Sequence, residues 1–420
     1  MRAEAVPVVP ARAVTRDRAR AAPATPRALA KPAERAPALV RWAFLLYAFS
    51  IPFESPVRIL PYDVPTIIGA LFLASTTLAP RLCYGRAPAA LWWFVAYLYA
   101  FGVAFALGGG AYAVQVQDQF VKLLQLVLIF WVGINLMREP GMAERMLLAL
   151  AAAAIVLGLL GLTGVANSQV MMDDGVRRAA VLGQNPNRTS RLLGTGVLAL
   201  AGLAYARPRA AVRPLLVWPL VVLLAGAMLR GGSRGGLLAM TVGFCVFTLA
   251  GASLAVRVRN LLAVALGLSL MAGAALQSPL MRQRLEMARS GNLAKREEIF
   301  PTAWGMFRER PLTGWGPTAN YYENASRMPM RGFESRDTHN LVLELLTSTG
   351  LLGTVPFLIG LGVAGAAAWR ARTGPQGMLP AAFVAALLVG NMSGNFLWFK
   401  VYWLVLSYAC AAQPAARPPR

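Results

Sequence analysis

The sequence predicts an all-α polytopic membrane protein, and both its composition and its hydropathy pattern lead to that class. Of the 420 residues, 57% are hydrophobic and only 14% are charged. Long apolar runs, separated by charged residues or by Pro and Gly, reach the roughly 20 residues that a helix needs to cross a bilayer. Inside lipid, only helices and closed barrels satisfy their own backbone hydrogen bonds, and runs of this length indicate helices.

About twelve spans follow from the apolar runs when the chain is taken in order. They cover approximately Ala38–Phe53, Val64–Leu78, Ala89–Leu107, Phe120–Met137, Leu147–Gly164, Asn187–Tyr205, Leu215–Leu229, Gly236–Ala252, Asn260–Ala275, Leu341–Trp369, Met378–Asn391 and Trp398–Ala411. The last two runs are short for a membrane span.

Basic residues give the chain an orientation. With the N-terminus in the cytoplasm, each cytoplasmic loop is short and carries arginine, as the positive-inside rule requires. These loops hold Arg81 and Arg86, Arg138 and Arg145, Arg207, Arg209 and Arg213, Arg257 and Arg259, and Arg370 and Arg372. Residues 1–37 predict a disordered basic cytoplasmic tail, and the absence of an apolar stretch before Ala38 argues against a cleaved signal peptide. We expect nine spans within 38–276, a periplasmic loop with amphipathic helices at 277–339, three spans within 340–413 and a cytoplasmic tail at 414–420.

The net charge of +23 does not indicate nucleic-acid binding. The tail and the inner loops carry most of the excess, where it acts as a topology signal and contacts anionic membrane lipids. The cysteines, Cys83, Cys245 and Cys410, lack the spacing of a metal site, and two of them fall inside apolar spans. We expect neither a disulfide framework nor a zinc site.

The segment 277–339 is too long for a structureless loop, and it predicts a folded functional element. Arg296, Phe300, Ala303 and Phe307 recur at helical spacing and indicate an amphipathic helix near the membrane surface, which Pro301 is expected to break. Trp304, Trp315, Tyr321 and Tyr322 supply aromatic faces. Aromatic rings of this kind stack on sugars, but they equally fill protein cores or membrane interfaces.

Several arginines break the positive-inside rule because they fall on the outer side. For Arg282, Arg284, Arg327 and Arg331, we expect solvated or snorkelling side chains. Arg234 differs because it stands in a glycine-rich turn, Leu229-Arg-Gly-Gly-Ser-Arg-Gly-Gly236. Glycines remove side-chain bulk, so backbone amides at the next helix start can approach an anion while the guanidinium binds it. The turn predicts a phosphate cradle.

His339 is the one histidine of the chain, and it lies where the polar segment meets the tenth apolar run. Imidazole is the side chain best suited to take a proton near neutral pH, so a catalytic base is one interpretation. A helix cap or a packing residue is the other. Asp337, or the pair Asp173 and Asp174, could orient this histidine. Paired acids without further ligands are a weak metal signal, and we expect no metal.

An ordered set of motifs resembles the O-antigen ligase and polymerase superfamily of bacterial membrane glycosyltransferases. The set comprises Arg178 followed by Gly183-Gln-Asn-Pro-Asn187, the Ser233-Arg-Gly235 turn, Arg296 with Ile299 ahead of Pro311-Leu-Thr-Gly-Trp-Gly-Pro317, and His339-Asn340 leading to Gly350-Leu-Leu-Gly353. The resemblance covers roughly Arg177 to Gly353. Val181, where relatives have a small residue, and Pro301, in a helix that is usually continuous, depart from the pattern.

The resemblance implies a fold like that of the C class of glycosyltransferases and a site at the periplasmic face of the bacterial inner membrane. It also implies transfer of an O-antigen from undecaprenyl diphosphate to lipid A-core, with inversion and without metal or cofactor. It assigns the diphosphate to Arg178, Arg234 and Arg296, and the general base to His339. Supporting roles fall to Asn187, Ser233, Asn340 and Asp337.

Other functions stay open at this point. A polymerase with a lipid-linked acceptor and a protein O-oligosaccharyltransferase share the same motifs. The position of the long loop between the ninth and tenth spans, with no soluble domain after the last span, favours the ligase. A lipid-linked sugar transporter would also have about twelve spans. Here, however, the unusual charges gather at the outer ends of spans and in one loop, whereas transporters commonly carry them at the bilayer midplane.

Overall fold

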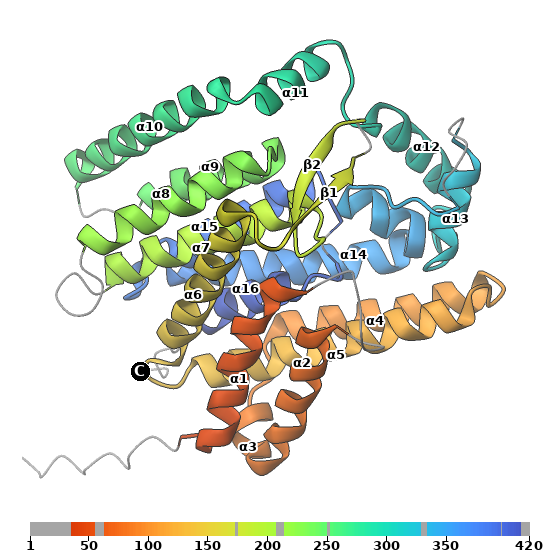
Figure 1. Cartoon of the computed structure of the whole chain (residues 1–420). Coiled ribbons are helices and arrows are strands. Elements are labelled where there is room, and N and C mark those ends of the chain that lie inside the picture. Colours follow the sequence, from red (N-terminus) through yellow and green to blue (C-terminus); the bar gives the residue numbers. More distant parts are fainter. Residues whose placement is uncertain are drawn as a thin grey trace, which may run out of the picture. The chain divides into compact units, whose positions relative to one another are not determined.

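The computed structural model describes residues 35–54, 63–172, 175–206, 214–249, 253–328, 334–395 and 397–412 (Figure 1). Most of the predicted N-terminal tail and the predicted C-terminal tail lie outside these residues. The pair Asp173 and Asp174, Arg331, and the inner-loop residues Arg207, Arg209 and Arg213 also lie outside them.

The all-α class is confirmed, and each predicted span overlaps a helix. These helices are α1 (Ala38–Ser50), α2 (Val64–Ser75), α4 (Ala89–Leu107), α5 (Ala113–Met137), α6 (Met142–Thr163), α7 (Pro186–Ala206), α8 (Pro214–Arg230), α9 (Arg234–Thr248), α10 (Leu254–Gln277), α14 (Leu341–Arg370), α15 (Leu379–Asn391) and α16 (Lys400–Ala411). Among the described residues, 5 helices are long and apolar enough to cross a membrane: α4, α5, α6, α10, and α14 with the turn after it. The short helix α3 (Pro80–Tyr84) joins α2 to α4. The chain is an all-α polytopic membrane protein.

Local capping sets where several of these helices begin. The carboxylate of Asp63 accepts a hydrogen bond from the Thr66 backbone N–H at 2.9 Å and starts α2. The hydroxyl of Ser233 accepts from the Gly236 N–H at 3.2 Å and starts α9. The side-chain oxygen of Asn340 accepts from the N–H groups of two following residues and starts α14. A polar cap satisfies backbone donors that a helix leaves unpaired at its first turn.

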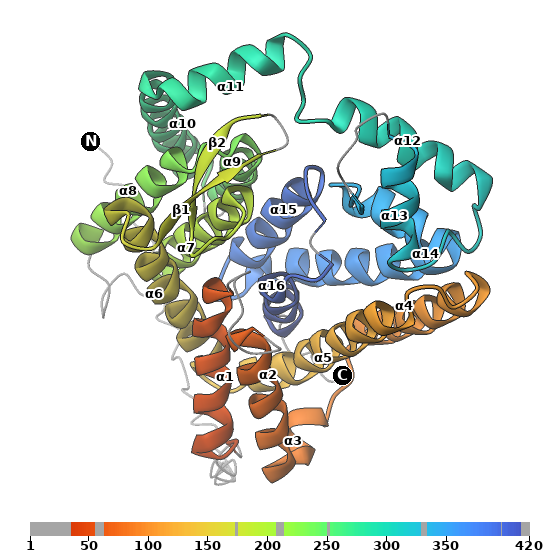
Figure 2. The same cartoon turned by 45° about the vertical axis from the view of Figure 1, so that its right-hand side comes forward.

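An aromatic cluster joins four helices in the core. The ring of Phe94 in α4 lies 5.3 Å from Phe130 in α5, 5.4 Å from Phe357 in α14 and 4.9 Å from Trp403 in α16, centroid to centroid. Such tilted and edge-on pairs are a favoured aromatic geometry. Helix α14 packs along α4, and α16 packs along α5, while α15 packs on α9 and α7 packs on α6 (Figures 1 and 2).

A β-hairpin that the sequence did not predict precedes α7. Strands β1 (Asn167–Met171) and β2 (Arg177–Val181) pair antiparallel, with Asn167 opposite Val181 and Met171 opposite Arg177. Alternation along β2 exposes Arg177 and buries Arg178 and Ala180. The alternation along this strand therefore directs the Arg178 side chain into the protein. An irregular loop would not fix the direction of that side chain.

The segment between α10 and α14 folds into α11 (Pro279–Arg289), α12 (Arg296–Glu309) and α13 (Ala319–Ser326), as Figure 2 shows. The expected break at Pro301 is wrong, because α12 continues through it. Pro301 lies on the exposed side, so water can satisfy the carbonyl that its missing N–H leaves unpaired. The expected apolar face is also shifted: Ile299, Ala303 and Met306 are the buried residues of α12.

The motif Pro311–Pro317 docks into a kink in α14. Gly350 has φ 59° and ψ −158°, which interrupts the helical hydrogen bonds of α14. The N–H of Trp315 donates to the Thr347 carbonyl at 2.8 Å, and the N–H of Leu351 donates to the Pro311 carbonyl at 2.8 Å. The neighbouring pairs, Gly316 to Ser348 and Leu352 to Leu312, repeat this pattern at 3.0 Å each. The inserted motif thus satisfies backbone groups that the kink opens.

Side chains of the same motif hold α13 against α12. The guanidinium carbons of Arg310 and Arg327 lie 4.1 Å and 4.7 Å from the Trp315 ring. Arg327 also bonds both carboxylate oxygens of Glu309, at 2.5 and 2.7 Å, and these hydrogen bonds lower the pKa of that carboxyl. Trp315 therefore packs within the protein, and the ring of Tyr322 stacks on Tyr112 at 4.1 Å. These two aromatic side chains therefore contribute to packing within the protein.

We predict that Gly350→Ala lowers the melting temperature of the purified protein. A Cβ at this position would lie 2.4 Å from the carbonyl of Leu312, and the backbone would keep a left-handed φ that disfavours alanine. Gly362→Ala, in the same helix, is the control because its Cβ meets nothing within 4 Å. The control should be neutral or slightly stabilising, since alanine is a better helix former than glycine. Equal melting temperatures for the two variants would refute the docking of the motif at the kink.

Candidate functional site

A cavity of about 320 Å³ gathers the predicted site residues from distant parts of the chain. We call it the arginine cavity. Its lining includes His339, Asp337, Arg178, Arg234, Arg296, Asn187 and Ser233, so every predicted site residue except Asn340 faces one space. Arg188, Arg191, Arg284 and Ser393 also line it, and sequence reasoning gave none of them a role in the site.

One group of arginines is held by the glycine-rich turn between α8 and α9. Arg178 donates to the carbonyls of Gly231 and Gly232 at 3.3 and 3.4 Å, and to the side chain of Asn187 at 3.2 Å. Arg284 donates to the Gly232 carbonyl. The carbonyl oxygens of the turn thus hold guanidinium groups in place, while Ser233 takes the Gly236 N–H. The structure thus shows the carbonyl oxygens of this turn fixing arginine side chains, whereas the sequence predicted that its backbone amides would approach an anion.

Arg234 joins this group through α11. Its guanidinium donates to the backbone carbonyl of Arg284 at 2.8 Å. The expectation that Arg284 is solvated is wrong, because the residue is 4% exposed. Met281 and Arg284 are the buried residues of α11, and their spacing puts both on one face of the helix. Arg282 on the same helix is exposed, as expected.

A second group of arginines is held by the turn between α15 and α16. The backbone carbonyl of Ser393 accepts hydrogen bonds from Arg191 and Arg296, each at 3.1 Å, and the Ser393 hydroxyl accepts another from Arg191 at 2.9 Å. Gly235 makes room for this turn, since a Cβ there would lie 2.6 Å from the Ser393 hydroxyl. Arg296 at the start of α12 and Arg191 in α7 thereby converge on one point.

His339 lies directly before α14 with its imidazole paired to a carboxylate. Its Nδ1 is 2.6 Å from Oδ1 of Asp337. Its backbone has φ 51°, in the left-handed region that residues other than glycine rarely adopt. Asn340, the cap of α14, donates from its side chain to the Met392 carbonyl at 3.4 Å. Asn340 thus supports the site by fixing the backbone beside His339.

Comparisons with known proteins find matches over part of the chain. A family model described as O-antigen ligase matches residues 219–358, which include Arg234, Arg296 and His339. An O-antigen ligase from Pseudomonas aeruginosa is 28% identical over 229 residues, and the match covers 52% of this chain and 52% of that protein. Over these residues the chain is similar to the O-antigen ligase superfamily. It spans about half the length of the relative that it matches.

An ionic cluster links the arginine cavity to the first helices of the chain. Arg188 pairs with Glu54, just after α1, and its guanidinium carbon lies 4.2 Å from the Phe399 ring. Lys400 is 3.0 Å from Glu54 and 2.8 Å from Asp63, and it is 1% exposed on its side chain. Charges buried this deeply need such partners. The cluster ties the ends of α1, α2, α7 and α16 together beside the cavity.

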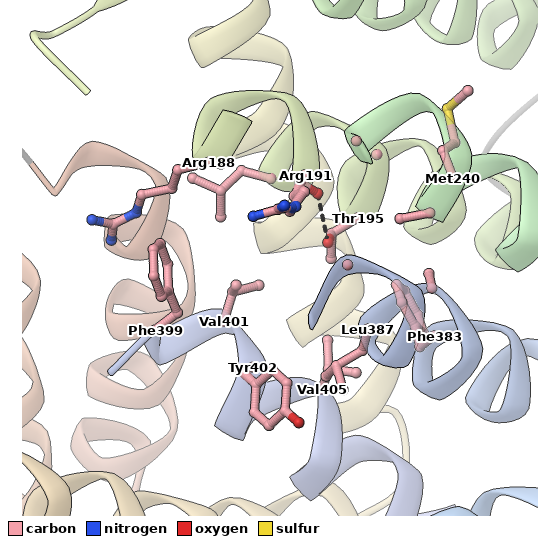
Figure 3. Close-up of a pocket in the computed structure, with 16 residues that line it drawn as sticks. Arg188, Arg191, Thr195, Met240, Phe383, Leu387, Phe399, Val401, Tyr402 and Val405 are labelled. Carbon is pink, nitrogen blue, oxygen red and sulfur yellow. Dashed lines mark hydrogen bonds between the residues drawn. The ribbon is translucent and has the colours of Figure 1, made fainter. Parts of the chain in front are cut away.

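A smaller apolar cavity adjoins the arginine cavity. It measures about 60 Å³ and is lined mainly by apolar side chains of α7, α9, α15 and α16. Figure 3 shows Phe383, Leu387 and Val405 around it, with Arg188 and Arg191 above them. Arg188, Arg191 and Phe399 line both cavities, so cationic and apolar spaces meet at these side chains.

The arginine cavity predicts an anion site that can be measured without any assay of transfer. Arg284→Gln should weaken the binding of inorganic diphosphate to the purified protein by about ten-fold to a hundred-fold, because a hydrogen bond to a charged group contributes about 1.5–3 kcal/mol. Arg282→Gln is the matched control on the same helix and should bind as the wild type does. Calorimetric titration at low and high salt gives both affinities. Equal loss in both variants would mean that only overall charge matters.

Proposed function

We propose that the chain is an O-antigen ligase. It transfers the polysaccharide from undecaprenyl diphosphate to a hydroxyl of lipid A-core at the periplasmic face of the inner membrane, with inversion and without a metal ion. The observation that carries this proposal is that the paired imidazole of His339 and the arginines Arg178, Arg234 and Arg296 line one cavity. A base and a set of cations facing one space are what glycosyl transfer from a diphosphate requires.

The imidazole supplies the base. A hydrogen bond from Nδ1–H of His339 to the Asp337 carboxylate leaves the lone pair on Nε2. In the proposed step, Nε2 takes the proton of the acceptor hydroxyl while the oxygen forms its bond to the anomeric carbon. The bond from that carbon to the diphosphate oxygen breaks, and both its electrons leave with the diphosphate. The negative Asp337 stabilises the imidazolium that results.

The arginines bind the leaving group. Negative charge grows on the bridging oxygen as the glycosidic bond breaks, and guanidinium groups fixed in advance stabilise it without reorganising. Arg178, Arg234 and Arg296 are each held by a backbone carbonyl, at 3.3, 2.8 and 3.1 Å. Their geometry is therefore set before any ligand arrives. Cations supplied by the protein support a reaction that is independent of metal, and the same activity with and without EDTA is the expected result.

The apolar cavity supports a lipid-linked donor. A diphosphate bound by the arginines would have apolar space beside Arg188 and Arg191 for the first part of its polyprenyl chain. The acceptor is the less constrained part of the proposal, because a polymerase and a protein O-oligosaccharyltransferase need the same base and the same cations. The ligase is favoured because the matched relative from Pseudomonas aeruginosa is an O-antigen ligase.

Expression in a Gram-negative strain that lacks its own ligase tests the proposal. With the matching core and O-antigen supplied, the wild-type chain should produce a long lipopolysaccharide ladder on a gel. His339→Gln should leave bare core, because loss of a general base typically lowers the rate about 10²–10⁴-fold. Asp337→Asn should give a weaker ladder. Immunoblots of the membrane fraction control for expression.

The outcomes separate the related functions. Bare core from the wild type, with the protein present in the membrane, would contradict the ligase. In that case, glycan repeats lengthened on the lipid would indicate a polymerase, and glycan on a protein would indicate protein glycosylation. A full ladder from His339→Gln would remove the histidine from the chemistry while leaving the ligase in place.

The apolar cavity makes a separate prediction about the donor lipid. Ala386→Leu should fill part of this cavity and raise the KM for a donor with a long polyprenyl chain more than for a donor with a short one. Ala385→Leu is the control, since the neighbouring residue does not line the cavity. Steady-state kinetics of purified protein with the two donors measure the difference. A similar KM change for both donors, or for both variants, would place the lipid chain elsewhere.

A further inference from the structure

We propose that Glu344 is a positioning residue for His339. The inference rests on the proposed function, in which His339 is the base, and it adds a residue that does not line the cavity. Glu344 lies in the first turn of α14 and is 2% exposed. A carboxylate buried to this extent is costly unless several hydrogen bonds satisfy it, so the identity of its donors indicates what it does.

The hydrogen-bond donors to Glu344 come from two segments, which are helix α13 and the loop of residues 336–340, which we call the histidine loop. The backbone N–H of Thr338 donates to Oε2 of Glu344 at 3.4 Å, and the Thr338 hydroxyl lies 3.1 Å from the same oxygen. The side chain of Asn320 in α13 donates to Oε1 at 2.9 Å. Glu344 therefore holds the residue that directly precedes His339 and ties it to α13.

Thr338 is fixed at two points. It is 0% exposed, and its hydroxyl also lies 2.9 Å from the carbonyl of Asn340. Asn340, on the other side of His339, caps α14 and bonds the Met392 carbonyl. His339 thus sits between two residues whose own side chains anchor them.

This anchoring explains the backbone of His339. A left-handed conformation is unfavourable for a residue with a Cβ, and it persists only where the surroundings determine it. With Thr338 held by Glu344, the chain must turn at His339, and the turn brings Nδ1 within 2.6 Å of Asp337. Without Glu344, the loop would relax toward ordinary backbone angles, and the imidazole would move away from its carboxylate.

α13 supports the same loop from the other direction. The N–H of Arg336 donates to the Tyr321 carbonyl at 2.9 Å, and the side chain of Asn324 donates to the Arg336 carbonyl at 3.1 Å. Asn320 additionally lies 3.3 Å from the Thr347 hydroxyl. Glu344 is the carboxylate on which α13, α14 and the histidine loop converge.

The test uses the fact that the chain has one histidine. With a purification tag free of histidine and [15N]-labelled imidazole, NMR spectra of the full-length protein in detergent report the tautomer of His339 alone. The variants are Glu344→Gln and Thr338→Val, with Thr338→Ser as the matched control. Each carboxylate oxygen of Glu344 accepts a hydrogen bond from an N–H group. Glutamine has only one oxygen, so its NH₂ group would face one of these N–H donors in either orientation of the amide. Valine has the shape of threonine without its hydroxyl, and serine keeps the hydroxyl.

We expect Glu344→Gln and Thr338→Val to shift the imidazole signals away from the Nδ1–H tautomer, and Thr338→Ser to keep them. In assays of transfer, the first two variants should lose about 10²-fold in kcat with little change in the KM for the donor, as a small displacement of a catalytic group would cause. Melting temperatures identify any variant that fails to fold. If Glu344→Gln does not fold, Thr338→Val against Thr338→Ser decides.

Unchanged imidazole signals in the folded variants would overturn the proposal. Shifted signals in a protein whose wild type transfers no glycan would leave the positioning of His339 intact and contradict the proposed function instead. A fall in kcat with unchanged signals would also refute the proposal, because Glu344 would then act by another route.

Discussion

The site depends on one constraint: arginines buried within a membrane protein must be satisfied by the protein itself. Here, backbone carbonyl oxygens at the turns between helices accept hydrogen bonds from the arginine side chains. Gly231 and Gly232 hold Arg178 and Arg284, and the Ser393 carbonyl holds Arg191 and Arg296. Helix ends leave carbonyl groups unpaired, so a turn that presents them is a natural partner for a guanidinium. Cations anchored in this way keep a fixed geometry before any ligand binds.

Much of this arrangement can be predicted from the sequence, and the parts that cannot be predicted have physical reasons. The apolar runs place the helices because lipid imposes a length on them, and His339, Arg178, Arg234 and Arg296 meet in one cavity as a set. Arg188 and Arg191 lie inside a predicted span, where an arginine is rare and usually functional, so that signal was present. Glu344 also lies inside a predicted span, Leu341–Trp369, so the same signal was present there. Arg284 carries no such signal, since only tertiary packing decides which face of the short helix α11 is buried.

The motifs that resemble the family fall into two groups, one that stabilises the fold and one that lines the arginine cavity. The Pro311–Pro317 segment and Gly350 contact each other, with main-chain bonds of 2.8 to 3.0 Å across the kink in α14. Glycines occur there because a Cβ at Gly314 or Gly350 would lie under 3.0 Å from backbone atoms. His339, the base in the proposed function, precedes Asn340 at the start of the same helix. The contact at the kink fixes the position of α14, and the histidine loop directly precedes that helix. The spacing between these motifs in the sequence therefore reflects how the segments pack.

The matched segment 219–358 cannot form the whole site. Arg178, Arg188 and Arg191 precede it, and Ser393 and Phe399 follow it, yet all of them line the arginine cavity. Arg188 in turn is paired with Glu54 near α1, within a cluster that includes Lys400 of α16. The lining of the arginine cavity therefore draws on residues on both sides of the matched segment, while His339 lies within it.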